Sequence, residues 1–127
     1  HNLFLLGHYY SNETFSKTAQ QMLNNVKEDA LQAPTEYYNW LNLMMNYTDD
    51  YFEVAISGKD AVAKTSQLQS YYLPNILIAG STAASKLPIL ENRFADNETY
   101  IYVCVNKACK MPEKEVNVAV GKIKNGL

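Results

Sequence analysis

Residues 51–79 read YFEVAISGKDAVAKTSQLQSYYLPNILIA, and this stretch predicts a strand, a helix and a second strand in that order. In residues 52–56 apolar side chains occupy alternate positions, which is the period of a half-buried strand. Gly58 then ends the strand, and Asp60 is suited to cap the helix that follows. The apolar run 76–79 is typical of a strand that is covered on both faces. A crossover of this length predicts a right-handed parallel βαβ unit.

The remainder of the C-terminal half continues this pattern. Residues 81–98 are expected to be mostly loop, with a helical turn at 87–92, and residues 100–105 are expected to form a third strand because Tyr, Ile and Val dominate there. A last helix is expected to open at Pro112. Residues 49–127 are therefore predicted to form a small α/β subdomain with a three-stranded, mostly parallel sheet and flanking helices.

The N-terminal half shows a helical period instead. Residues 13–32 and 37–45 each carry apolar side chains at helical spacing, and Ser11 or Asn12 is expected to cap the first of these helices. The loop between them is short, so the two are expected to form an antiparallel hairpin within residues 1–48. The expected fold class is α/β, with α+β as the alternative, in which this hairpin packs with the small sheet as one unit.

Composition excludes several classes of function. The chain has 127 residues and a net charge of −2, and Arg93 is its only arginine, so nucleic-acid binding is not expected. The apolar runs are much shorter than the roughly 18 residues of a membrane span, and a soluble protein is expected. Two cysteines are too few for a secreted disulfide scaffold, which leaves the compartment open and slightly favours the cytoplasm.

The two cysteines, Cys104 and Cys109, lie at the exit of the predicted third strand. The favoured interpretation is a pair of reduced structural thiols, because a free cysteine commonly behaves as a small buried hydrophobe. The alternative is a disulfide or redox pair, in which a turn at Asn106 brings the two Cα atoms to within roughly 4.4–6.8 Å. The spacing differs from that of thioredoxin-like active sites. A metal site would have to recruit His1, His8 or a carboxylate, and none is expected.

Other candidate chemistry is weak. Both histidines, His1 and His8, lie in the first eight residues, with no nucleophile signature elsewhere, so no catalytic triad is expected. Residues 78–82 place Gly and hydroxyl groups at the end of a strand but lack the spacing of a phosphate loop, and a turn is favoured. Asp49 and Asp50 are adjacent and are interpreted as a polar break. We therefore expect no catalytic residue, no cofactor and no enzymatic activity of this chain by itself.

Four motifs occur in order along the chain: Asn39-Trp40-Leu41, Tyr72-Leu73-Pro74-Asn75, Leu87-Pro88 with Arg93, and Tyr102-Val103-Cys104-Val105-Asn106 followed by Cys109 and Pro112. Together they resemble the C-terminal end of the YyaL-like family of thioredoxin-domain-containing proteins. This family includes bacterial members and the animal spermatogenesis-associated thioredoxin-domain proteins. The resemblance implies a parent with an N-terminal thioredoxin-like domain, then a barrel of helical hairpins similar to six-hairpin glycosidases, and then this segment.

The same resemblance implies that the thioredoxin-like cysteines and any acids of the barrel lie upstream, so it assigns no catalytic residue here. The expected function is a non-catalytic structural or accessory segment whose partners are the upstream domains of the same chain. One alternative is a thiol or disulfide relay element that uses Cys104 and Cys109. Another is a part of a carbohydrate-acting enzyme of the glycosidase or epimerase type. No nucleic-acid or membrane partner is expected.

Overall fold

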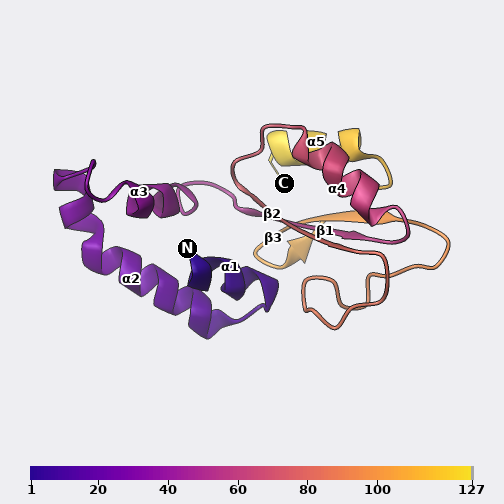
Figure 1. The fold of residues 1–127 in the computed structure, drawn as a ribbon, viewed down its shortest axis with the longest axis horizontal. Helices are drawn as coiled ribbons and strands as arrows, with labels where there is room; N and C mark the ends of the chain where they lie inside the picture. Colours follow the sequence, from indigo (N-terminus) through magenta and orange to yellow (C-terminus); the bar gives the residue numbers. More distant parts are fainter. Residues whose placement is uncertain (127) are drawn as a thin grey trace. The chain divides into compact units, whose positions relative to one another are not determined.

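A computed structural model describes residues 1–126 of the chain, so that only Leu127 of the predicted 49–127 subdomain lies outside the described residues. The chain divides into two compact units, His1–Asp50 and Tyr51–Leu127, and each is described by itself (Figure 1). The described residues contain five helices and one four-stranded mixed sheet. The mixed α/β class predicted from the sequence is therefore confirmed.

The N-terminal unit contains three helices, α1 (Asn2–Tyr9), α2 (Glu13–Gln32) and α3 (Tyr38–Met45). Helix α2 begins after Asn12, whose side-chain oxygen accepts a hydrogen bond of 3.1 Å from the backbone N–H of Phe15. This contact satisfies one of the N–H groups that a helix start leaves unpaired. The predicted cap is confirmed at Asn12.

The N-terminal helical hairpin is present, but its closest pair is α1 with α2, and α3 packs less extensively against α2. The prediction had paired residues 13–32 with 37–45. Gly7 contributes to the contact of α1 with α2, since a Cβ atom at this position would lie 2.3 Å from Ser16 Oγ. Without that atom, α1 and α2 can approach closely.

The C-terminal unit contains strands β1 (Phe52–Ser57), β2 (Ile76–Ser81), β3 (Tyr100–Val105) and β4 (Ala108–Cys109), in the order β2-β1-β3-β4. Strands β1 and β2 are parallel and are joined by helix α4 (Ala61–Gln69), as the sequence predicted. Strand β3 runs antiparallel to β1, and β4 runs antiparallel to β3. The prediction of a three-stranded, mostly parallel sheet is therefore wrong, because only one of the three strand pairs is parallel.

The sequence predicted that β1 is half-buried and that β2 is covered on both faces, and the structure shows the reverse. All six residues of β1 are buried, because this strand lies inside the sheet and both of its faces are covered. Strand β2 is an edge strand with alternating burial. The alternation of apolar and polar residues in the sequence of β1 comes from Glu53 and Ser57, whose side chains are polar although the residues are only 7% and 1% exposed. A polar position was thus mistaken for a solvent-facing one.

The hydrophobic core lies on one face of the sheet. Because successive residues of a strand point to opposite faces, Val54 of β1 and its partner Val103 of β3 face this core. Helices α4 and α5 (Val116–Lys124) cover it, and Figure 1 shows them together on one side of the sheet. The opposite face carries Glu53 and Cys104, which are also paired in register.

Two helix starts differ from the prediction. Pro112 does not open the last helix, because Glu113 forms an antiparallel bridge with Ile101. The distance from Ile101 N to Glu113 O is 2.7 Å, and the distance from Glu113 N to Ile101 O is 2.8 Å. This extended pairing delays α5 to Val116. Asp60 occupies the N-cap position of α4 without a side-chain cap hydrogen bond. In residues 1–126 no helix combines the length and the apolar character needed to cross a membrane.

Candidate functional site

Cys104 and Cys109 form a disulfide, with their Sγ atoms 2.07 Å apart. They are register partners in β3 and β4, and Asn106 and Lys107 form the turn between these strands with φ values of 50° and 68°. Positive φ at both central residues is the signature of a type I′ hairpin turn. The turn expected at Asn106 is present. The Cα atoms are 3.9 Å apart, closer than the expected range.

The two cysteines have very different exposure. Cys104 lies in β3, inside the sheet, and is 1% exposed, whereas Cys109 lies in the outermost strand β4 and is exposed. Cys109 is therefore the more exposed residue of the pair. The favoured prediction of two reduced structural thiols is wrong, because the two sulfur atoms are bonded to each other.

The guanidinium group of Arg93 lies against both sulfur atoms. Its Nη1 is 3.5 Å from Cys104 Sγ, and its Nη2 is 3.3 Å from Cys109 Sγ. The guanidinium carbon also lies 4.8 Å from the centre of the Tyr102 ring, and the Tyr102 hydroxyl donates a 3.4 Å hydrogen bond to the Arg93 carbonyl. A cation held over an aromatic face at this distance is attracted by the ring. Arg93 is therefore held in place from two sides.

The loop between β2 and β3 delivers Arg93 to this position. The backbone N–H groups of Leu90 and Glu91 both bond to the carbonyl of Leu87, at 2.7 and 2.9 Å, which forms the turn expected at residues 87–92. Asn92 ends this turn with a φ of 58°, a conformation that asparagine tolerates better than most residues. The next residue in the chain is Arg93.

Glu53 places a buried carboxylate beside the bridge. It is the register partner of Cys104, and its Oε2 accepts a 3.2 Å hydrogen bond from the backbone N–H of Lys107 in the hairpin turn. Burial lowers the pKa of Arg93, and Coulombic interactions with Tyr102 and Glu53 oppose that shift. Arginine remains protonated in such surroundings, so the bridge lies next to a positive charge.

Sequence reasoning found the two cysteines but missed Arg93 and Glu53. Arg93 had two signals, since it is the only arginine of the chain and belongs to one of the four resemblance motifs. Glu53 had one signal, a carboxylate within an otherwise apolar strand. Neither signal specifies a partner, because both residues reach the hairpin from distant parts of the sequence.

The other predicted candidates lie in ordinary structural roles. His8 packs edge-on against Phe4, with ring centres 4.6 Å apart, which agrees with its interpretation as a packed histidine. The backbone N–H of Asp50 bonds to Asp49 Oδ1 at 2.8 Å, as in a polar turn. Within the described part of the chain, no group of three or more His, Cys, Asp or Glu side chains is arranged to hold a metal ion.

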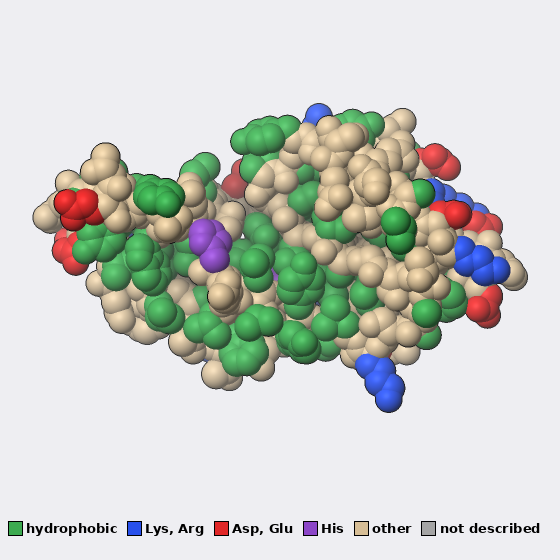
Figure 2. All heavy atoms as spheres, in the orientation of Figure 1, with side chains coloured by type: hydrophobic (Ala, Val, Ile, Leu, Met, Phe, Trp, Pro, Cys, Tyr) green, Lys and Arg blue, Asp and Glu red, His purple; other side chains and the backbone are tan. Residues whose placement is uncertain are grey.

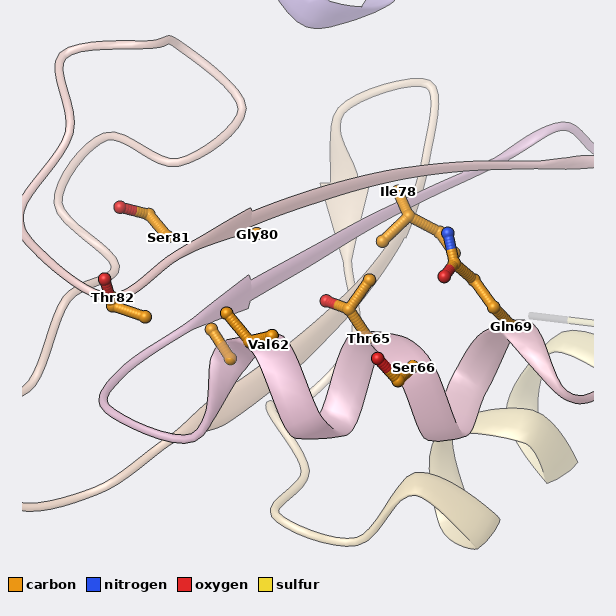
Figure 3. A pocket seen from close by; sticks show the side chains of 9 residues that line it. Val62, Thr65, Ser66, Gln69, Ile78, Gly80, Ser81 and Thr82 are labelled. Carbon is orange, nitrogen blue, oxygen red and sulfur yellow. The ribbon is translucent and has the colours of Figure 1, made fainter.

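The segment 78–82 borders a cavity of about 460 Å³ between α4 and β2. Figure 3 shows Thr65, Ser66 and Gln69 along the helix side of this cavity and Ile78 and Gly80 on the strand side. All of the lining residues are uncharged. Ser81 Oγ donates a 2.6 Å hydrogen bond to the carbonyl of Ala83, so this end of the segment is tied into a turn.

Comparison with known proteins assigns no family. No family model matches the chain, and neither a curated protein nor a solved structure is significantly similar to it. The resemblance to the YyaL-like family stays a prediction. The site is therefore interpreted from its geometry.

Proposed function

We propose that the Cys104–Cys109 bridge is a reversible thiol–disulfide exchange site, which was one of the alternatives drawn from the sequence. The observation that carries this proposal is the unequal exposure of the pair: Cys109 is exposed in β4, and Cys104 is 1% exposed in β3. Exchange requires that an incoming thiolate reach one sulfur in line with the bond to the other. Because Cys109 is exposed, we expect its sulfur to be the one that an incoming thiolate reaches in the folded protein.

The reaction conserves atoms and electrons with a dithiol as the reductant. One thiolate of the dithiol attacks Cys109 Sγ, the bond between Cys104 and Cys109 breaks, and Cys104 leaves as a thiolate. The second thiol of the reductant then attacks the mixed disulfide and releases Cys109. The dithiol is oxidised to a disulfide, and both cysteines of the protein are reduced. The upstream thioredoxin-like domain implied by the sequence resemblance is a dithiol of this class.

Native-state reduction tests the proposal. The 127-residue chain is incubated with dithiothreitol in the absence of urea and quenched with acid, the reductant is removed, and the chain is then unfolded and alkylated so that mass spectrometry can identify every thiol formed in the native state. We expect both cysteines to become labelled while far-UV circular dichroism stays native. A matched reaction in urea gives the labelling of the unfolded chain. If Cys104 and Cys109 were labelled only at urea concentrations that unfold the protein, the bridge would be a structural one.

A second candidate function is the accessory segment of a larger protein. The observation that favours it is the apolar surface of the N-terminal unit, where Figure 2 shows hydrophobic side chains in green over the helices. The exposed large hydrophobic residues of this unit are Leu6, Tyr10, Met22, Leu31, Tyr38, Met45 and Tyr47. Several exposed hydrophobic side chains on the helices of one unit are candidates for packing against another part of a protein.

Hydrogen exchange tests this second candidate. Amide protection in residues 1–50 would be compared between this chain and a longer chain that also contains the upstream domains. Packing against upstream helices predicts slower exchange in α1 and α2 of the longer chain. Equal protection in the two chains would contradict the accessory role.

A further inference from the structure

A neutral disulfide does not by itself account for the contact that the Arg93 guanidinium group makes with it. The sulfur atoms of a disulfide are neutral and are weak hydrogen-bond acceptors, whereas partial burial of a guanidinium group costs solvation. Arg93 nevertheless directs one nitrogen to each sulfur, at 3.5 Å for Cys104 and 3.3 Å for Cys109. These two contacts become strong only when a sulfur carries a negative charge, because charge-assisted hydrogen bonds are about twice as strong as neutral ones.

We propose that Arg93 is a catalytic residue of the exchange reaction and stabilises the thiolate that leaves Cys104 when a thiol attacks Cys109. This inference rests on the proposed function. In the step concerned, the attacking sulfur forms a bond to Cys109 Sγ and the electron pair of the broken bond stays on Cys104 Sγ. Arg93 donates a hydrogen bond to that pair and keeps its own proton. The thiolate later takes a proton from solvent.

Cys104 is the sulfur that needs such help. It is 1% exposed, and a thiolate formed there lacks the water that would stabilise it at the surface. The carboxylate of its register partner Glu53 adds negative charge on the same face of the sheet. Nη1 of Arg93 supplies the positive charge that offsets both effects. Nη2 does the same for Cys109 in the second step, when the mixed disulfide is resolved.

The surroundings hold Arg93 ready before the reaction begins. The Tyr102 ring supports the guanidinium face, and the Tyr102 hydroxyl bonds to the Arg93 carbonyl. A charge that is already positioned stabilises a developing anion without the cost of reorganisation, which is the general basis of electrostatic catalysis. The same contacts would also suit a purely structural arginine, so the test needs a measurement that packing by itself does not change.

The experiment compares the full chain with Arg93→Gln, Arg93→Lys and, as a matched control, Lys110→Gln. Lys110 is exposed and follows Cys109 directly in the sequence, so the control removes a nearby positive charge at the surface. Two quantities are measured: the second-order rate of native reduction by dithiothreitol, and the thiolate absorbance of the reduced protein at 240 nm as a function of pH.

We expect Arg93→Gln to slow reduction by about tenfold or more and to move the thiolate titration to higher pH, since one charge-stabilising donor is removed from each sulfur. Arg93→Lys keeps the charge but loses the two-pronged contact, so its rate should fall between those of wild type and Arg93→Gln. Lys110→Gln should stay within about twofold of wild type, as expected for an exposed charge screened by solvent.

An unchanged rate and an unchanged thiolate titration in Arg93→Gln would overturn the inference, even if that variant were less stable. If Arg93→Gln does not fold, the Arg93→Lys variant decides: slower reduction supports the role, and the wild-type rate contradicts it. Failure of the proposed function has a different signature. In that case the wild-type bridge resists reduction in the native state, whatever residue occupies position 93.

Discussion

Breaking the Cys104–Cys109 bridge should lower the free energy of unfolding by about 2 kcal/mol. The two cysteines are 5 positions apart in the sequence, so the bridge closes a ring of about six residues. The chain-entropy relation for a ring of that size gives about 2 kcal/mol at 25 °C, near the lower end of the usual range because the ring is short. The hairpin turn at Asn106 and Lys107 is also held by the 3.2 Å hydrogen bond from the backbone N–H of Lys107 to Glu53 Oε2, so it should persist after reduction.

Urea unfolding with and without a phosphine reductant measures this difference. For a urea dependence of about 2 kcal/mol per molar, the midpoint should fall by about 1 M when the bridge is reduced. The Cys104→Ala, Cys109→Ala double variant serves as the control, since its midpoint should not respond to the reductant. Identical midpoints for oxidised and reduced wild type, with complete reduction verified by thiol counting, would refute the reasoning.

Gly58→Ala should destabilise the protein by about 2 kcal/mol or more in urea unfolding, because φ is +138° and the new Cβ would lie 2.5 Å from Thr99 Cα. Gly121→Ala, with nothing within 4 Å, should instead stabilise α5 by about 1 kcal/mol. Leu68→Ala, at a position 0% exposed, should cost about 2–5 kcal/mol by the same assay. Burial raises the pKa of Tyr47 above 10.0, so stability present below pH 10 should fall as pH rises through the folded-state pKa, and Tyr47→Phe should reduce that loss.

Local sequence signals were enough to predict the parallel pair of strands. Residues 51–79 contain a strand, a helix and a strand within one continuous stretch, and the short crossover fixes their direction. The direction of β3 could not be predicted in the same way. It follows a long loop with no intervening helix, and such a loop can return the chain from either end of the sheet. The prediction of a mostly parallel sheet was wrong at β3, which runs antiparallel to β1 and makes the sheet mixed.

In the candidate site, too, a feature formed by neighbouring residues could be predicted, whereas contacts between residues far apart in the sequence could not. Asn106 indicated the turn that pairs Cys104 with Cys109, because the geometry of a two-residue hairpin depends on the residues within it. Arg93 is 11 positions away from its partner Cys104 in the sequence, and Glu53 is 54 positions away from its partner Lys107. No periodicity or spacing encodes contacts of that kind. The residues that give the bridge its electrostatic surroundings could be found only in the folded chain.

The most direct test of thiol exchange at this site is the position of the mixed disulfide. Wild-type chain would be treated in the native state with 2-mercaptoethanol, quenched with acid during the reaction, and digested for mass spectrometry. Attack at the exposed sulfur predicts an adduct on Cys109, together with an unmodified thiol at Cys104. An adduct on Cys104, or a bridge that stays closed until the protein unfolds, would contradict the account.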